Sequence, residues 1–279
     1  MGEPPRPTPL LGHRVAGPAD GTPLVLVHGF TQNAGCWGPV EHDLAVDHRL
    51  VLLDAPGHGA SAAARLAWPA AIDALAATGG RGTWIGYSMG GRLALGVALT
   101  HPEAVERLVL VGASAGIADP VERAARRGDD AALARHLLAV GLDAFLDEWL
   151  AQPLFGGLTV DQAQRSARRA NTADGLAAAL RDLGTGAQPD LRPALDRLRR
   201  RRLPVLVVVG ADDAKFTAIG HELVQAIGPT ASLSSIAGAG HTAHLERPEP
   251  FLEALRQWLG STAGPTTHDP TTDDPTIQR

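Results

Sequence analysis

A serine lies in a motif that is typical of an exposed nucleophile. Residues 86–91 read GYSMGG, a G-x-S-x-G pattern centred on Ser88, with an apolar strand-like run before it and a helix-like stretch after it. The glycines allow a tight strand-to-helix turn that exposes the serine hydroxyl at the edge of a sheet. Because Met89 then begins a helix, its backbone amide is expected to form half of an oxyanion hole.

The other half of this oxyanion hole is expected in the loop that follows an earlier apolar run. Residues 24–27 lead directly into His28, Gly29 and Phe30. The backbone amide of Phe30 is predicted to turn toward the same point as that of Met89. We interpret His28 as a structural histidine that holds this loop, and we assign only the Phe30 amide to the site.

Two further residues are needed to activate the serine: a histidine that takes its proton and a carboxylate that orients the histidine. The chain order for this kind of motif is Ser, Asp or Glu, His. A run of valines ends shortly before Asp212 and Asp213, and either carboxylate fits the role of the acid. His241 follows a glycine-containing loop directly after a predicted strand, so we favour it as the base, and we interpret His244 as its neighbour.

Short apolar runs alternate with helix-like segments along the chain. The runs are continuous rather than alternating, as in strands that are covered on both faces. This order predicts an α/β protein with a mostly parallel, doubly wound sheet. The predicted strands are residues 24–27, 50–53, 83–86, 108–111, 205–209 and 232–236, and the clearest predicted helices are residues 68–77, 92–100 and 219–227.

The alternation is interrupted once, by a long helical insertion. Residues 116–202 are rich in Ala, Arg and Leu and contain no convincing strand, so we predict a cap over the carboxyl ends of the strands. The flanking segments, residues 10–115 and 203–262, are then the two parts of the core. Residues 263–279 are rich in Thr, Asp and Pro and are expected to be a disordered tail.

Composition argues against several classes of function. The chain has 279 residues and a formal net charge of −5, which argues against nucleic acid or an anionic membrane surface as the main partner. Its single cysteine, Cys36, excludes an intrachain disulfide and a cysteine-based metal site. The N-terminal sequence lacks the features of a signal peptide, and no apolar run has the roughly 18 residues that a membrane span needs. We therefore expect a cytoplasmic protein.

The sequence predicts no cofactor and no metal ion. Residues 238–243 match the pattern G-x-G-x-x-A, but they lie near the end of the predicted sheet, whereas a dinucleotide fingerprint opens an early strand-helix-strand unit. The pairs His241 and His244, or Asp54 and His58, lack a complete set of three ligands.

Several motifs together resemble the α/β-hydrolase superfamily over nearly the whole chain. They are HGF at 28–30, DAPGHGAS at 54–61, GYSMGG at 86–91 and GH at 240–241. Other motifs, two of them in the predicted cap, resemble a narrower family, the MenH-like 2-succinyl-6-hydroxy-2,4-cyclohexadiene-1-carboxylate synthases of menaquinone biosynthesis. They are GYSMGGR at 86–92, WLAQPLF at 149–155, GTGAQP at 184–189 and DAKF at 213–216.

This resemblance implies a role for individual residues. It places the acid at Asp213, and counting back from Trp149 it selects Arg126 from the group Arg123, Arg126 and Arg127. The residues that it assigns to substrate contact are Tyr87, Arg92, Arg126, Trp149, Arg168 and Lys215.

The assignments of Trp149 and Lys215 to substrate contact each have an alternative interpretation, whereas that of Arg92 has independent support. Trp149 is equally well interpreted as part of the cap core, and Lys215, the only lysine in the chain, as a chance survivor. Arg92 lies four residues after Ser88, on the same face of the predicted helix, where a guanidinium suits a carboxylate better than an acyl chain.

The resemblance implies a cofactor-free carbon–oxygen lyase acting on a small polycarboxylate. The expected reaction is elimination of pyruvate from 2-succinyl-5-enolpyruvyl-6-hydroxy-3-cyclohexene-1-carboxylate, with Ser88, His241 and Asp213 abstracting a proton. The main alternative is a hydrolase of an ester or a carbon–carbon bond, in which Ser88 forms an acyl-enzyme. A further alternative is a non-catalytic binding protein on a hydrolase scaffold.

Overall fold

The computed structural model describes residues 8–261. The predicted tail, residues 263–279, and most of the N-terminal segment lie outside the described residues. The strands are β1 (His13–Ala16), β2 (Thr22–Val27), β3 (His48–Leu53), β4 (Gly82–Tyr87), β5 (Val105–Val111), β6 (Val205–Gly210) and β7 (Ala231–Ile236). The α-helices are α1 (Pro39–Leu44), α2 (Trp68–Gly79), α3 (Met89–Thr100), α4 (Pro120–Val140), α5 (Leu142–Leu150), α6 (Arg165–Arg168), α7 (Ala173–Leu183), α8 (Asp196–Arg200), α9 (Ala214–Ile227), α10 (Ala243–Glu246) and α11 (Pro248–Ser261).

The strands form one seven-stranded sheet with the order β1-β3-β2-β4-β5-β6-β7. All neighbouring pairs are parallel except β1 and β3, which are antiparallel. The predicted α/β-hydrolase-like architecture, a mostly parallel doubly wound sheet, is therefore confirmed. Sequence analysis missed β1, a four-residue edge strand without an apolar run, in which His13, Arg14 and Val15 are exposed.

Alternate residues of each central strand face two different hydrophobic cores. In β2, Val25 and Val27 pack in the core beneath α2, α3, α8 and α9, whereas Leu24 and Leu26 pack in the core beneath α1, α10 and α11. Successive side chains of a strand point to opposite faces, so a sheet covered on both faces needs apolar residues at every position. The continuous apolar runs in the sequence are the consequence.

The order of the strands reverses direction between β2 and β4. From β2 the chain moves outward to β3 and then returns to the other side of β2 to form β4. The loops at the carboxyl ends of these two strands therefore diverge, and a crevice opens where they separate. Phe30 follows β2 and Ser88 follows β4, so the topology places both predicted site residues at this crevice.

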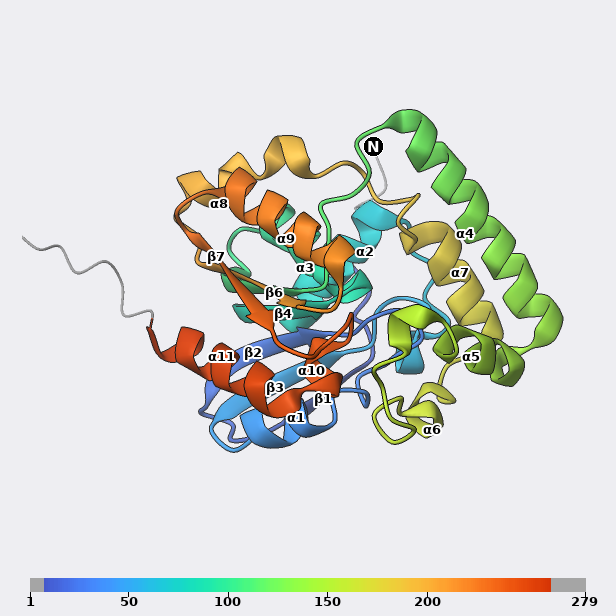
Figure 1. Ribbon diagram of the computed structural model, residues 1–279, viewed down its shortest axis with the longest axis horizontal. Helices are drawn as coiled ribbons and strands as arrows, with labels where there is room; N and C mark the ends of the chain where they lie inside the picture. Colours follow the sequence, from blue (N-terminus) through green and yellow to red (C-terminus); the bar gives the residue numbers. More distant parts are fainter. Residues whose placement is uncertain (1–7, 262–279) are drawn as a thin grey trace, which may run out of the picture.

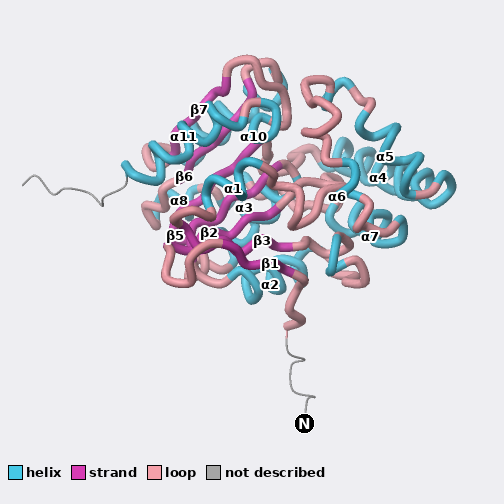
Figure 2. Tube along the Cα trace, turned by 90° about the horizontal axis from the view of Figure 1, so that it is seen from below, coloured by secondary structure: helices cyan, strands magenta, loops and turns pink. Residues whose placement is uncertain are grey.

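The long insertion divides into a cap and a segment that returns to the core. Helices α4, α5 and α7 lie together on one side of the sheet (Figures 1 and 2), with a small hydrophobic core of their own. Helix α8 lies beside α9, far from α4 (Figure 1), and its Leu198 belongs to the same core as α3. The segment predicted as cap, residues 116–202, thus includes a part near its end that packs with the sheet domain.

Within the described residues, no helix combines the length and apolar character that crossing a bilayer requires.

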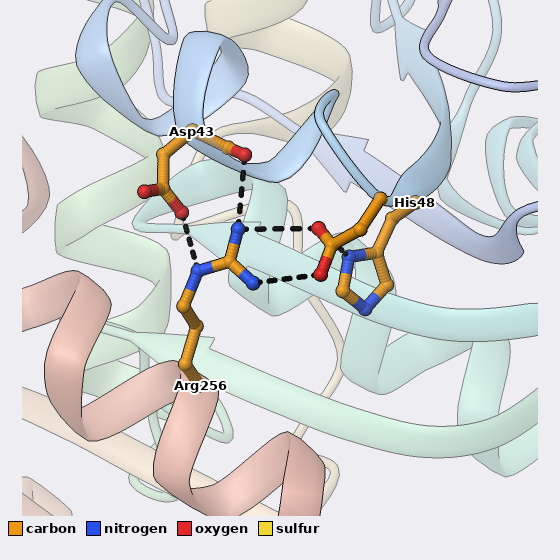
Figure 3. A network of polar contacts seen from close by, with 4 residues as sticks. Asp43, His48 and Arg256 are labelled. Atoms are coloured by element: carbon orange, nitrogen blue, oxygen red, sulfur yellow. Dashed lines mark hydrogen bonds and ion pairs between the residues drawn. The ribbon is translucent and has the colours of Figure 1, made fainter.

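An ion-pair network fastens the last helix to the first. Arg256 of α11 donates through Nε to Asp43 Oδ1 of α1 at 2.6 Å and through a terminal nitrogen to the Asp43 carbonyl at 2.9 Å (Figure 3). Its guanidinium also pairs with Asp47 at 3.0 Å, and Asp47 in turn contacts His48 Nδ1 at 2.8 Å. Arg256 therefore neutralises two carboxylates and caps the end of α1.

We expect Arg256→Met to lower the free energy of unfolding by about 1 kcal/mol, because the guanidinium holds several groups in a fixed geometry although it is partly exposed. The matched control is Arg200→Met, which breaks an exposed i,i+4 pair with Asp196 and is expected to cost only a few tenths of a kcal/mol. Urea denaturation of the two variants measures the difference. Equal losses would contradict a special role for the Arg256 network.

Candidate active site

Ser88 occupies a sharp turn between β4 and α3. Its φ is 50° and its ψ is −110°, in the left-handed half of conformational space that side chains rarely adopt. The turn requires close backbone approaches on both sides. A Cβ on Gly90 would lie 1.9 Å from the carbonyl oxygen of Val27, and a Cβ on Gly86 would lie 2.4 Å from that of Gly90. The glycines of the motif are therefore a steric requirement of the turn.

Ser88, His241 and Asp213 form one continuous hydrogen-bonded chain. His241 Nε2 lies 3.1 Å from Ser88 Oγ, and His241 Nδ1 lies 2.9 Å from Asp213 Oδ2. With Nδ1 protonated and donating to the carboxylate, Nε2 is free to accept the serine proton. The three side chains come from the ends of three different parallel strands, so the fold brings together residues that are up to 153 positions apart.

The two carboxylates between which sequence reasoning left a choice have different surroundings. Asp213 is also the N-cap of α9, because its Oδ1 accepts a hydrogen bond from Phe216 N at 3.1 Å. Burial opposes ionisation of this carboxyl, but hydrogen bonds from His241 and from Phe216 N outweigh it, so its pKa lies below the ordinary value. Asp212 is exposed and no side-chain hydrogen bond joins it to His241.

The two residues whose amides are predicted to form the oxyanion hole, Phe30 and Met89, line the same cavity as Ser88. Met89 is the first residue of α3, where backbone N–H groups have no partner within the helix. Phe30 lies in the turn that follows β2. His241 lines this cavity as well, so the structure is compatible with the predicted oxyanion hole, which remains a prediction.

A cavity of about 570 Å³ lies above the serine, between the sheet and the cap. Its size suits a drug-sized or smaller organic molecule. All the residues that the sequence assigned to substrate contact line it: Tyr87, Arg92, Arg126, Trp149, Arg168 and Lys215.

Arg92 is held by the end of α7 and by the segment that follows it. Its guanidinium donates to Gln188 Oε1 and to the Leu183 carbonyl, each at 3.0 Å, and the side chain is buried. Burial and the neighbouring charge of Arg126 lower the pKa of Arg92 to about 10, so the group remains charged at neutral pH. Sequence analysis gave no role to Gln188, whose side chain is fully buried. The only sign of it in the sequence was its place in the GTGAQP motif.

Arg126 is the member of the arginine cluster on α4 that reaches the cavity. Its Nε donates to Asp130 Oδ1 at 2.8 Å, and the other oxygen of this buried carboxylate accepts from Gly186 N at 3.0 Å. Arg123 and Arg127 instead bind backbone carbonyl groups and are not among the residues that line the cavity.

Aromatic residues of the cap pack against the turn after β2. The Trp149 ring lies edge-on to Phe30, with centroids 5.1 Å apart, and stacks on Phe145 at 5.9 Å. Trp149 is thus both part of the cap core and part of the cavity wall, so its two interpretations are compatible. Arg168 is almost fully buried, and burial lowers the pKa of its guanidinium. Its neighbour Arg169 is exposed and pairs with Asp143.

A carboxylate that sequence analysis missed holds the loop of His241. Glu246 accepts hydrogen bonds from the backbone N of Gly240 at 2.7 Å and of Thr242 at 2.9 Å, the two residues that flank the histidine. It also accepts one from Thr242 Oγ1 at 2.5 Å. The flexible glycine loop is therefore fixed by one buried side chain, and only the spacing of five residues from His241 hints at this in the sequence.

The remaining histidines near the site are buried and structural. His28 Nε2 accepts from Ala55 N at 3.1 Å and Nδ1 contacts the Gly29 carbonyl at 2.8 Å, which fits the interpretation that it holds the loop. His244 packs against Tyr87, with ring centroids 4.4 Å apart. Burial lowers the pKa to about 4 for His28 and to about 3 for His58 and His244.

Within residues 8–261, no group of three or more His, Cys, Asp or Glu side chains is arranged to hold a metal ion. Asp54 and His58 are occupied otherwise, since Asp54 accepts from the backbone N of Ala34 and of Ala60, and His58 Nδ1 contacts the Pro56 carbonyl.

Comparison with known proteins identifies the class to which this fold and site belong. Residues 24–254 match the model of the alpha/beta hydrolase family, and the chain belongs to that family. Within it, the chain is 36% identical over 252 residues to the 2-succinyl-6-hydroxy-2,4-cyclohexadiene-1-carboxylate synthase of Salmonella newport, covering 86% of this chain and 94% of that protein.

Solved structures with the same fold are similar to this chain over most of its length. MenH from S. aureus is similar with a TM-score of 0.79 and 28% identity, over 89% of this chain and 97% of that one. The enol-lactonase from Burkholderia xenovorans LB400 is similar with a TM-score of 0.71 and 26% identity, over 90% and 96% of the two chains. The same scaffold is therefore found in a MenH and in an enol-lactonase.

Because three buried histidines have lowered pKa values, we predict that the free energy of unfolding falls in acid. The folded-state pKa values of His28, His58 and His244 lie below the unfolded value of about 6.5, so below that pH the unfolded state binds more protons. The free energy of unfolding is therefore greatest above pH 6.5 and falls toward pH 4, by about 1.4 kcal/mol per pH unit for each histidine. Chemical denaturation between pH 7.5 and pH 4.5 measures this slope.

Replacement of one of these histidines separates their share of the slope from that of other groups. His244→Leu keeps an apolar contact with Tyr87 and is expected to remove about 1.4 kcal/mol per pH unit of the dependence below pH 6.5. An unchanged slope in this variant would show that the buried His244 does not contribute.

Proposed function

We propose that this protein is a cofactor-free carbon–oxygen lyase that makes 2-succinyl-6-hydroxy-2,4-cyclohexadiene-1-carboxylate in menaquinone biosynthesis. The proposed substrate is 2-succinyl-5-enolpyruvyl-6-hydroxy-3-cyclohexene-1-carboxylate, from which pyruvate is eliminated. One observation carries the proposal: a complete Ser88–His241–Asp213 chain opens into a cavity whose wall includes Arg92 and Arg126. The similarity to named synthases over most of the chain supports the same reaction.

The reaction begins with loss of a proton next to the succinyl ketone. His241 Nε2 takes the hydroxyl proton of Ser88, and the serine oxygen takes the proton from ring carbon 2. The electrons of that C–H bond form an enolate, whose oxygen is held by the Phe30 and Met89 amides. Ser88 thus acts as a base, and no acyl-enzyme forms.

The enolate then expels the leaving group across the ring. A double bond forms between carbons 2 and 3, the existing double bond moves from carbons 3 and 4 to carbons 4 and 5, and the bond from carbon 5 to oxygen breaks. The departing enolpyruvate regains a proton, which the His241 imidazolium supplies, and becomes pyruvate. The two double bonds of the product lie at positions 2 and 4, as its name requires.

The cationic groups of the cavity suit a substrate with several carboxylates. Arg92 is fixed by Gln188 and Arg126 by Asp130, so both guanidinium groups are oriented before a substrate arrives. Charge-assisted hydrogen bonds from such groups are among the stronger polar interactions in proteins. The cavity lining also includes the acidic residues Asp119, Glu122, Asp130 and Glu222, so the placement of Arg92 and Arg126, and not an overall positive charge, is what would attract a carboxylate.

A serine hydrolase is the second candidate, and the geometry of Ser88 favours it to the same degree. The same elbow and amides suit attack of the serine oxygen on an acyl carbon. The arginine-lined wall is the feature that favours the lyase, because it offers little to a neutral acyl chain.

The two candidates are separated by supplying the purified protein with the enzymatically generated enolpyruvyl substrate and measuring pyruvate release, with p-nitrophenyl acetate hydrolysis in parallel. Pyruvate release with negligible esterase activity is expected. Ester turnover with a burst of product and no pyruvate release would overturn the lyase in favour of the hydrolase.

Ser88→Ala is expected to lower kcat for pyruvate release by at least about 10³-fold, because the variant has no oxygen to accept the substrate proton. Binding of the substrate should persist, since the arginine-lined wall is untouched. Steady-state kinetics and equilibrium binding to the inactive variant measure the two effects. A variant with full activity would eliminate the proposed relay.

Arg126→Gln is expected to raise KM for the substrate by about 10- to 100-fold, through the loss of a charge-assisted hydrogen bond to a carboxylate. The matched control is Arg127→Gln, next in sequence, whose side chain binds the Gly186 carbonyl outside the cavity and whose loss should leave KM within about twofold. Equal effects of the two substitutions would argue against an Arg126 contact with substrate.

A further inference from the structure

The turn that carries the Phe30 amide contains a residue in an unfavourable conformation. Gln32 N donates to the Gly29 carbonyl at 3.2 Å and closes a four-residue turn with Phe30 and Thr31 at its centre. Thr31 has a φ of 67°, a value that glycine adopts freely and a β-branched residue almost never does. Other contacts must therefore hold Thr31 in this conformation.

These contacts come from the end of α6 and from the segment between α6 and α7. Asn171 Nδ2 donates to the Thr31 carbonyl at 2.7 Å, and the Arg168 guanidinium donates to Thr31 Oγ1. Both partners are buried, and they lie 140 and 137 residues away from Thr31 in sequence. The strained turn is thus held from the side of the cap.

Asn171 joins three separate pieces of backbone. Besides Thr31, its Nδ2 donates to the Arg168 carbonyl at 2.9 Å, and its Oδ1 accepts from Gly59 N at 2.8 Å in the loop after β3. A side-chain amide offers both donors and an acceptor, and here each is used. A smaller or purely acidic side chain at this position would leave buried backbone groups without partners.

We propose that Asn171 is a positioning residue of the oxyanion hole. By holding the Thr31 carbonyl it keeps the turn in its left-handed form, and this fixes the direction of the Phe30 N–H. Asn171 is not among the residues that line the cavity, so it acts on the reaction through the backbone groups that it binds, and the turn that carries the Phe30 amide is the one nearest the predicted oxyanion hole. The inference rests on the proposed function, because it assumes that the Phe30 amide stabilises the enolate oxygen.

A second role of Asn171, simply anchoring the cap, predicts different kinetics. A loosened cap would displace Arg126 and Trp149, weaken substrate binding and raise KM. A misdirected Phe30 amide would weaken an interaction that forms only as charge develops on the substrate, so kcat would fall while KM changed little.

The test compares Asn171→Ala and Asn171→Asp with the matched control Thr172→Ala. Thr172, the next residue, caps α7 by accepting from Gly175 N at 3.0 Å, and its hydroxyl makes no hydrogen bond to the turn. Both Asn171 variants are expected to lower kcat for pyruvate release by about 10- to 100-fold, with KM within about threefold. Thr172→Ala should leave both constants within about twofold although it removes a helix cap.

Asn171→Asp adds a sharper comparison, because it keeps the acceptor for Gly59 N, loses the donor and places a carboxylate oxygen against the Thr31 carbonyl. If this variant retained the wild-type kcat, holding the Thr31 carbonyl would not matter and the proposal would be overturned. An equal loss of kcat in Thr172→Ala would overturn it as well.

A second readout does not depend on the lyase reaction. Attack of Ser88 on a fluorophosphonate develops negative charge on the phosphoryl oxygen, which the same amides stabilise. We expect Asn171→Ala to slow this labelling by about tenfold and Thr172→Ala to leave it unchanged. A wild-type protein that is labelled but releases no pyruvate would overturn the proposed function alone. An Asn171→Ala variant with the wild-type labelling rate and kcat would overturn the positioning role alone.

Discussion

A close backbone approach between the first turn of α3 and the end of β2 is the constraint on which the site depends. Because Gly90 has no side chain, the first turn of α3 can pack against the Val27 carbonyl. This contact fixes the position of Ser88 relative to the loop after β2. The sheet order then supplies the crevice, because β2 and β4 are neighbours at the point where the chain reverses direction. The hydrogen bonds of His241 and the turn at Phe30 are arranged around that fixed point.

Much of this arrangement could be predicted from the sequence because its signals are local. The strands β2, β3, β5 and β6 contain continuous apolar runs, and the glycines of the GYSMGG motif are a steric requirement of its turn. Contacts between distant segments had no such signal. Asp212 and Asp213 differ only in which of them reaches His241, and Gln188 and Asn171 owe their importance to partners about 100 and 140 residues away. The exposed edge strand β1 and the return of α8 to the core were missed because short elements take their structure from what they pack against.

The electrostatics of the cavity depend on groups behind its surface. Burial of Arg92 and the neighbouring charge of Arg126 lower the pKa of Arg92. A buried carboxylate and a buried amide, Asp130 and Gln188, hold the two cations in place. The wall is thus oriented before a ligand binds, which reduces the reorganisation that an anionic substrate must induce.

The two hydrogen-bonding oxygens of Asp213 have a consequence for how this site would change in evolution. One oxygen orients His241, and the other caps α9, so folding alone is a reason to keep the aspartate. His241 has no comparable duty in a helix or strand, and the strained backbone at Ser88 makes that position a cost to folding. A descendant that lost its reaction would therefore retain the acid long after the serine and the histidine had drifted. In sequences of this kind, the pair Ser88 and His241 is the more reliable sign of an active enzyme.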